Sequence, residues 1–439
     1  MRTLPLMAAG LLAATLLTSP TAYAASETCQ GQPATIVGTP SQYGLIGTEG
    51  PDVVVTNGAL GVKTLGGDDL VCVTDEPGRR LGVTLDTGPG DDVVDGTFTL
   101  ADIEAVLGSG SDTYSGSPAR DQVVTGDGSL DNEQDIVSSG VGTSATNAGD
   151  QVRSGSRGVP NSDVLVLGGI GSEVLWSGPM AAGARLDVGP NSTLVPDLGA
   201  GDVSIDAASG TMTTDGVQTL AWTGPFTSFT LFATVAPRSL ELTGSDRDEF
   251  VYTSFTDGDG RQRYDLGAGD DTVLSPDGAG GAGSRYAGGA GEDDIELWAG
   301  DRLDLDLASG KLEMRQDGRA VKGRFNGFET SRLGAQRVEI LGTKRADEIR
   351  FYACRATVRG RGGKDDIASY RTGEDGYLLD CDARKSGIKI YGDGGRDTIG
   401  GSRGKDLLVG GTGRDIINGN ANRDTCSGEK LKSCEIKRR

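Results

Sequence analysis

Aspartate and glycine recur with a fixed period near the end of this chain, and both residue types suit the binding of a metal ion. Between residues 392 and 426 an aspartate returns every nine residues, at Asp397, Asp406, Asp415 and Asp424. Glycine stands two residues before the first three of these, and Asn422 takes that place before the fourth. Calcium takes oxygen ligands from carboxylates and backbone carbonyls. The spacing therefore predicts a row of calcium sites.

The elements that must position these carboxylates follow from the period. The glycine-rich half of each repeat predicts a tight turn, because glycine adopts positive φ without a Cβ clash. An apolar residue two positions after each aspartate predicts a short strand with one inward side chain. Two repeats then make one coil, so that Asp397 lies over Asp415 and Asp406 over Asp424. Stacked carboxylates repel by about 3 kcal/mol at roughly 5 Å and an effective dielectric constant near ~20, and calcium would neutralise them.

This nonapeptide, G-G-x-G-x-D-x-U-x with U apolar, resembles the repeat of the hemolysin-type calcium-binding (RTX-like) family. Looser copies add eight aspartates to the candidate calcium ligands: Asp52, Asp69, Asp92, Asp112, Asp121, Asp271, Asp293 and Asp365. The opening TCQGQPATIVGT, followed by LGGDDLVC, resembles the start of exported actinobacterial members of that family. The resemblance implies an all-β, elongated parallel β-roll or β-helix that binds Ca2+ in Gly-Asp turns outside the cell.

The candidate ligands differ in their charged surroundings. In the last four repeats the residue before the aspartate is basic: Arg396, Lys405, Arg414 and Arg423. Residues 392–439 contain seven acidic and ten basic residues, a net charge of +3, whereas residues 47–135 contain eighteen against four, a net charge of −14. The N-terminal repeats therefore have the greater need of calcium, although the C-terminal repeats match the motif better.

A longer repeat of about one hundred residues is superposed on the short one. Residues 203–210 (VSIDAASG) match 303–310 (LDLDLASG). Self-similarity of this kind is typical of a solenoid, and the alternating apolar residues predict strands. We expect a signal peptide at 1–24, an N-terminal Gly-Asp region at 25–170, a middle region with longer rungs at 171–353, and a C-terminal β-roll and cap at 354–439.

The beginning of the chain predicts export. Residues 1–24 contain a lone Arg2, an apolar run, and Ala22-Tyr23-Ala24 before Ala25, which together indicate a signal peptide with a small-x-small cleavage site. No later segment has the length and apolar character of a membrane span. We therefore expect a secreted mature protein that begins at or near Ala25.

Six cysteines lie in the expected mature chain, and an even number in an exported protein predicts disulfides. Several pairings are possible. The nearest neighbours along the chain favour Cys29–Cys72, Cys354–Cys381 and Cys426–Cys434, which would pin the terminal coils. The alternative is a structural zinc site, which would have to be all-thiolate because the chain contains no histidine.

Composition also restricts the function. The absence of histidine excludes H-E-x-x-H zinc proteases and Ser-His-Asp or Cys-His catalysis. The formal net charge of −21 argues against nucleic acid as a partner. No pair of carboxylates stands out as catalytic, so we do not predict an enzyme. Two alternatives remain: a calcium-dependent polysaccharide lyase or other carbohydrate-active β-helix, and a metal-free structural or adhesive surface protein whose aspartates only form turns.

Overall fold

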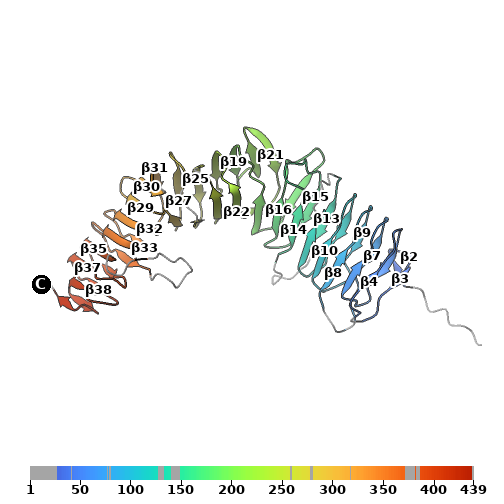
Figure 1. The fold of residues 1–439 in the computed structure, drawn as a ribbon, viewed down its shortest axis with the longest axis horizontal. Helices are drawn as coiled ribbons and strands as arrows, with labels where there is room; N and C mark the ends of the chain where they lie inside the picture. The colour runs from blue at the N-terminus through green and yellow to red at the C-terminus, as the bar shows by residue number, and fades with distance from the viewer. Residues whose placement is uncertain are drawn as a thin grey trace, which may run out of the picture.

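The computed structural model describes residues 27–40, 42–76, 78, 81–126, 133–139, 149–257, 260–276, 280–316, 318–370, 381 and 386–437. The expected signal peptide at 1–24 lies outside these residues. The described chain is built from short strands, and these stack as rungs along a curved axis, with the first and last rungs at opposite ends (Figure 1). The predicted all-β, mostly parallel solenoid is confirmed. In the described part of the chain, no helix has the length and apolar character needed to cross a membrane.

Each coil of the N-terminal region contributes one strand to each of two parallel sheets. The first sheet contains β3 (Ile36–Val37), β5 (Val53–Val55), β7 (Leu70–Cys72), β9 (Val93–Asp95), β11 (Thr113–Ser115), β13 (Ile136–Ser139), β15 (Val164–Leu167) and β17 (Arg185–Val188). The second begins with β4 (Leu45–Ile46), β6 (Gly61–Lys63), β8 (Val83–Asp86), β10 (Ile103–Val106), β12 (Asp121–Val124), β14 (Gln151–Ser154), β16 (Glu173–Trp176) and β18 (Ser192–Pro196). Odd and even strands therefore alternate between the two faces.

The second sheet continues without a break through the middle and C-terminal regions. Its parallel strands are β22 (Phe226–Val235), β24 (Phe250–Asp257), β26 (Thr272–Ser275), β28 (Asp294–Trp298), β32 (Thr330–Leu341), β33 (Glu348–Arg359), β34 (Asp366–Ser369), β36 (Thr398–Gly400), β38 (Ile416–Asn418) and β40 (Lys430–Lys432). The facing strands are β19 (Asp202–Asp206), β23 (Ser239–Thr243), β25 (Arg261–Ala268) and β27 (Arg285–Ala290), then β29 (Arg302–Asp306), β35 (Gly387–Gly394), β37 (Leu407–Thr412), β39 (Thr425–Ser427) and β41 (Ile436–Lys437).

The long repeat corresponds to two similar excursions from the parallel stack. In the first, β19 continues into β20 (Thr211–Thr214) and β21 (Val217–Ala221), and the three strands pair antiparallel. In the second, β29 continues into β30 (Lys311–Gln316) and β31 (Arg319–Asn326) in the same way. The matching sequences at 203–210 and 303–310 therefore form equivalent structures, and only these excursions depart from the parallel arrangement expected of the middle region.

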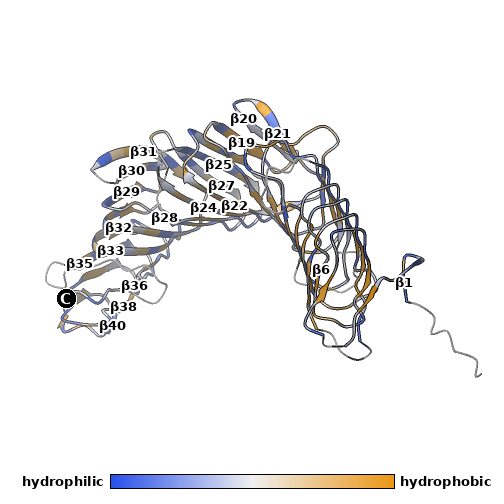
Figure 2. Ribbon diagram, turned by 45° about the vertical axis from the view of Figure 1, so that its right-hand side comes forward, coloured by the Kyte–Doolittle hydropathy of each residue, from blue (hydrophilic) through white to orange (hydrophobic). Residues whose placement is uncertain are grey.

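The core lies between the two faces and consists of inward side chains in columns. Val54, Val71 and Val94 occupy one position on successive rungs, and each is buried. Ile367, Ile399 and Ile417 form the corresponding column in the C-terminal coils. Hydrophobic and hydrophilic residues alternate along the strands, as Figure 2 shows. Burying one such side chain contributes about 1.5–3 kcal/mol, so the columns hold the rungs together.

Three disulfides tie the two ends of the stack. Cys29, in β1 (Thr28–Cys29), is bonded to Cys72 in β7, Cys354 in β33 to Cys381, and Cys426 in β39 to Cys434. The hairpin of β1 with β2 (Gln32–Pro33) precedes the first rung. All three favoured pairings are confirmed, and the all-thiolate zinc alternative is wrong because no thiolate remains. Disulfides of this number are typical of an oxidising, extracellular environment.

Candidate metal centres along the carboxylate ladders

The candidate aspartates stack at the entrances of the strands. In the C-terminal coils the backbone N–H of Asp397 donates to Oδ1 of Asp415 at 3.0 Å, and that of Asp406 donates to Oδ1 of Asp424 at 2.9 Å. The predicted stacking at an interval of eighteen residues is thereby confirmed. Each carboxylate accepts a charge-assisted hydrogen bond from the backbone of the preceding rung, and we call such a series a carboxylate ladder.

Five ladders of this kind run along the described chain. The first contains Asp52, Asp69, Asp92, Asp112, Asp135 and Asp163. The second contains Asp121 and Asp150, and the third, further along the same sheet, Glu249, Asp271, Asp293 and Glu329. The fourth contains Asp347, Asp365, Asp397, Asp415 and Glu429, and the fifth Asp406, Asp424 and Glu435. All twelve aspartates singled out from the sequence are members.

The ladders also contain residues that the repeat pattern missed. Asp135, Asp150 and Asp163 were missed because their coils are irregular in length. Connections of only two or three residues between strands end in Glu329, Glu429 and Glu435, and each glutamate accepts the bond through Oε2. The extra methylene of glutamate lengthens the side chain at these short connections. An acidic residue directly before a strand is the signal that identifies them, whatever the length of the turn.

Backbone conformation divides the turns into two classes. In the first, which we call left-handed turns, the residues four and two positions before the carboxylate both have positive φ. The pairs are Leu65 and Gly67, Gly88 and Gly90, Gly108 and Gly110, Gly267 and Gly269, Gly289 and Gly291, Arg361 and Gly363, Asp393 and Gly395, Gly411 and Gly413, and Asn420 and Asn422. This region of φ favours glycine and asparagine. Glycine stands two positions before the carboxylate in every one of these turns except that of Asp424, where Asn422 takes its place, whereas other residues also occur four positions before it.

Eight of these nine left-handed turns leave one carboxylate oxygen without a hydrogen bond among the described residues. While Oδ1 accepts the backbone bond of the ladder, Oδ2 is buried and has no hydrogen-bond partner within the described residues for Asp69, Asp92, Asp271, Asp293, Asp365, Asp397, Asp415 and Asp424. Thr64 lies beside Asp69, but its hydroxyl donates to the carbonyl of Thr87 at 2.6 Å. A buried polar atom without a partner costs about 1–3 kcal/mol, and more when it is charged.

In the second class, which we call hydroxyl turns, serine or threonine stands four positions before the carboxylate. These residues are Thr48, Ser117, Ser245, Thr343 and Ser402, and they serve Asp52, Asp121, Glu249, Asp347 and Asp406. In the turn of Asp406, the Ser402 N–H donates to Oδ2 at 2.6 Å and its hydroxyl donates to Oδ1 at 2.9 Å. A hydroxyl turn thus satisfies its own carboxylate.

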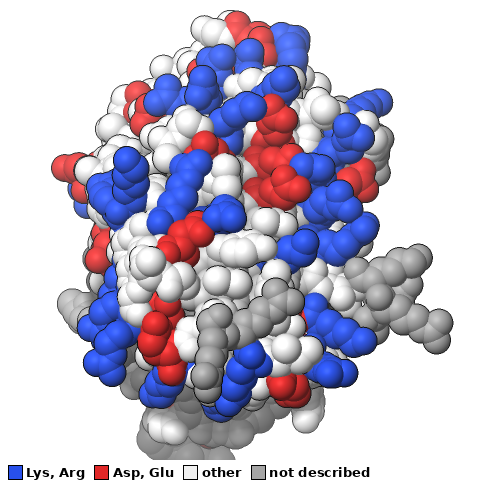
Figure 3. All heavy atoms as spheres, turned by 90° about the vertical axis from the view of Figure 1, so that its left-hand side faces the viewer, with Lys and Arg blue, Asp and Glu red and all other residues white. Residues whose placement is uncertain are grey.

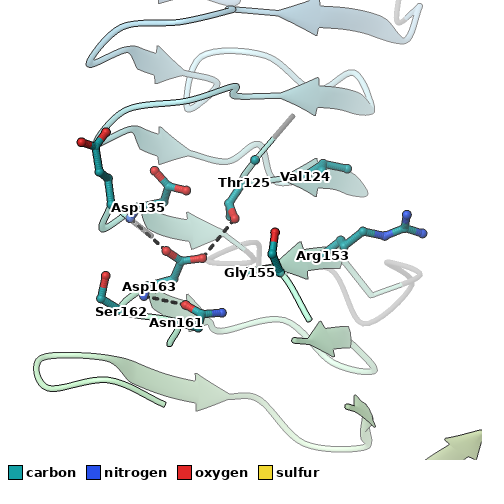
Figure 4. Close-up of a pocket in the computed structure, with 11 residues that line it drawn as sticks. Val124, Thr125, Asp135, Arg153, Gly155, Asn161, Ser162 and Asp163 are labelled. Atoms are coloured by element: carbon teal, nitrogen blue, oxygen red, sulfur yellow. Dashed lines mark hydrogen bonds between the residues drawn. The ribbon is translucent and has the colours of Figure 1, made fainter. Parts of the chain in front are cut away.

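The first ladder ends in a different way, at a small pocket around Asp163. Asp163 Oδ1 accepts the N–H of Asp135 at 3.1 Å, and Oδ2 accepts the hydroxyl of Thr125 at 3.0 Å (Figure 4). Oδ2 also accepts the hydroxyl of Ser154 at 2.7 Å. Figure 4 also shows the Asp163 N–H bonded to the side chain of Asn161. Neutral donors therefore close the ladder here and leave no carboxylate oxygen for a cation.

Burial changes the acidity of the open carboxylates. Removal from water raises the pKa of Asp92, Asp271 and Asp365 to about 7, and acidic neighbours on adjacent rungs add to the effect. Burial likewise raises the pKa of Asp424 to about 6. The pKa values of Asp69, Asp293 and Asp397 are also raised, again mainly by burial. Near neutral pH, Asp92, Asp271 and Asp365 therefore hold a proton part of the time unless a cation takes its place.

The oxygen set of the left-handed turns fits calcium. A Cβ built on Gly392 would lie against Asp397 Oδ2 and 2.5 Å from the carbonyl oxygen of Gly410 on the next rung. A Cβ on Gly360 would similarly meet Asp365 Oδ2 and, at 2.8 Å, the carbonyl oxygen of Gly392. No group of three or more acidic or cysteine side chains that could hold a metal occurs among the described residues. A cation here would thus use two carboxylates together with backbone carbonyls, which calcium accepts.

Comparison with models of known protein families gave no match for this chain, and comparison with curated proteins gave none either.

Proposed function

We propose that this chain is a secreted calcium-binding protein whose ions occupy pairs of stacked left-handed turns. The observation that carries the proposal is the buried, unbonded Oδ2 of the carboxylates in these turns. Two such carboxylates are adjacent in four places: Asp69 with Asp92, Asp271 with Asp293, Asp365 with Asp397, and Asp397 with Asp415. The disulfides support the extracellular setting.

Calcium suits these pairs better than magnesium does. Magnesium demands near-ideal octahedral geometry and retains several waters, whereas calcium tolerates irregular sets of carboxylates and backbone carbonyls. The pairs are buried and sit beside backbone turns, as Gly360 and Gly392 show. A divalent ion at each pair would offset two negative charges that the fold holds together.

The proposal also assigns rungs that do not bind calcium. The hydroxyl turns of Asp121 and Asp406 supply hydrogen bonds to both carboxylate oxygens. For Asp52, Thr48 of the turn bonds Oδ2 and Thr35 of the preceding rung bonds Oδ1. Asp424 lies in a left-handed turn, but it stacks on Asp406 and Glu435, so it lacks an open neighbour. The hydroxyl turns favour the metal-free alternative, because their carboxylates are already hydrogen-bonded. In that alternative every aspartate acts only within its own turn.

Calcium titration separates these functions. Isothermal titration of the mature protein, after removal of metal with a chelator, should show saturable calcium binding with a stoichiometry near the number of open pairs. Asp397→Asn should lower the stoichiometry most, because Asp397 belongs to two pairs. Asp406→Asn is the matched control and should leave it unchanged. No binding at all would favour the metal-free structural protein.

A further inference from the structure

The two ends of the solenoid carry opposite charge. Residues 1–300 contain 41 acidic and 13 basic residues, a net charge of −28, whereas residues 301–439 contain 22 and 29, a net charge of +7. The first and last rungs lie at opposite ends of the stack (Figure 1). Opposite charges at the two ends therefore do not meet within one molecule.

The C-terminal end presents basic side chains that are not neutralised. Eight of them are exposed and have no ion-pair partner among the residues that the structure describes: Arg396, Arg403, Lys405, Arg414, Arg423, Lys430, Lys432 and Lys437. Seen end-on, this part of the molecule shows many Lys and Arg side chains around its periphery, with groups of Asp and Glu between them (Figure 3). Such a surface attracts an acidic partner, most strongly at low salt.

The N-terminal end combines an apolar edge with acidic flanks. Tyr43 is 91% exposed and Ile46 is 74% exposed, both in or beside the edge strand β4. Behind this edge, the exposed turn residues Glu49, Asp68 and Asp91 follow on successive coils. Large apolar side chains on an open edge mark an interaction site. The acidic residues behind them favour a partner that is basic.

Both ends also have unpaired strand edges of the same polarity. Within the described chain, β3 pairs with β5 alone and β4 with β6 alone, while β40 pairs with β38 alone and β41 with β39 alone. All these pairings are parallel, so a further rung can continue either sheet in the same direction. Lysines on β40 and β41 repel a second basic end, and the acidic coils repel a second acidic end.

We propose that the protein associates head to tail, with β40 and β41 of one copy docked on β3 and β4 of the next. The occupant of each end is thus a second copy of this chain. The contact is heterologous and does not use the same surface twice, so it extends into linear chains. Because it depends on exposed charge and strand edges, it does not require the calcium proposed above.

Sedimentation of the mature, chelator-treated protein over a range of concentrations tests this association. At low salt the average mass should rise with concentration, and it should stay at the monomer value near 1 M salt, where the Debye length falls from roughly 30 Å to roughly 3 Å. The triple variant Lys430→Glu, Lys432→Glu, Lys437→Glu should weaken association at least tenfold. The matched control Arg285→Glu, Arg315→Glu, Lys322→Glu changes the net charge equally but lies away from the ends, and it should associate as the wild type does.

A charge exchange makes the test specific for the two ends. A second variant, Glu27→Lys, Glu49→Lys, should also lose self-association. Its mixture with the lysine-reversed variant should associate again, into chains in which the two variants alternate, because every basic end then meets an acidic end. Unchanged melting curves establish that the variants are folded. A wild type that remains monomeric at low salt, or a control that weakens as much as the end variant, overturns the proposal.

Discussion

The left-handed turns of the N-terminal and C-terminal coils both stack buried carboxylates, but the charged residues beside these carboxylates differ. At Asp69 and Asp92 the preceding residue is also acidic, and the N–H of Asp91 donates to Oδ1 of Asp68 at 3.1 Å, so a second row of carboxylates runs beside the first. At Asp397 the preceding residue is Arg396. Negative charge therefore accumulates in the N-terminal turns, whereas in the C-terminal turns basic neighbours partly offset the charge of the stacked aspartates.

The residue five positions before the aspartate also differs between the two regions, and this difference favours the C-terminal coils as cation sites. Five residues before Asp397 stands Gly392, and because it has no Cβ, Asp397 Oδ2 and the carbonyl oxygen of Gly410 both pack close to the backbone there. The same position before Asp92 is Thr87, whose hydroxyl donates to the carbonyl of Leu107. Charge thus favours cation binding in the N-terminal coils, and shape favours it in the C-terminal coils. The difference shows that a good match to the repeat does not by itself identify the tightest site.

The largest expected difference between the two ends concerns their disulfides. Cys29–Cys72 spans 43 residues and Cys426–Cys434 spans 8. In the loop-entropy description, losing the first costs about 4 kcal/mol and losing the second about 2.6 kcal/mol. Thermal unfolding of Cys29→Ser/Cys72→Ser and of Cys426→Ser/Cys434→Ser should rank in this order. Equal melting temperatures would show that the ends do not differ in this respect.

The next comparison concerns calcium itself. A site that is present only in the folded state stabilises it by about 2.7 kcal/mol at a hundredfold excess of calcium over Kd. Asp92→Asn should remove the most calcium-dependent increase in melting temperature, because its ion also relieves repulsion from the neighbouring acidic row. Asp397→Asn should remove less, and Asp406→Asn almost none. If Asp397→Asn removes more than Asp92→Asn, the shape of the site outweighs the charge.

When calcium is removed, the stability of the folded protein should fall as the pH rises from about 5 to about 7.5. The pKa values of Asp92, Asp271 and Asp365 are raised from 3.8 to about 7 in the folded state. Between these two values the folded state holds protons that the unfolded state has released, so stability is complete below pH 3.8 and falls as the pH rises towards 7. In chelator the protein should therefore melt at a higher temperature near pH ~5 than near pH ~7.5.

Calcium replaces those protons, so it should abolish the loss of stability at the higher pH. Differential scanning calorimetry of chelated and calcium-loaded samples at both pH values measures the effect. A chelated protein that is equally or more stable near pH ~7.5 would contradict the assignment of these carboxylates as buried and unneutralised.

The smallest expected effect is one additional site. Ser402→Gly removes the hydroxyl and the Cβ from the turn of Asp406, and glycine can adopt the positive φ of a left-handed turn. Asp424 on the next rung is already open, so the pair would be complete. Titration should then show one more calcium ion than in the wild type. Ser209→Gly, in the turn between β19 and β20, is the matched control and should leave the number unchanged.

Sequence reasoning reached the stacking of Asp397 on Asp415 because nine residues is a fixed half-coil there. It missed Asp163, which stacks on Asp135 after 28 residues, since no fixed period relates such positions. It could not separate Asp406 from Asp415 either. Both follow glycine-rich turns, and only backbone φ and the hydrogen bonds of Ser402 show that one carboxylate is satisfied and the other is open.

The direction of the ladder bonds has a consequence for how such a chain evolves. Each coil within a ladder brings one backbone donor for the coil after it and one carboxylate acceptor for the coil before it. Duplicating or deleting a whole coil therefore leaves donors and acceptors in balance, and no orphaned group results. In three ladders the last coil has a distinct residue, Glu329, Glu429 or Glu435. The number of coils is thus free to drift while the chemistry of each junction stays constant.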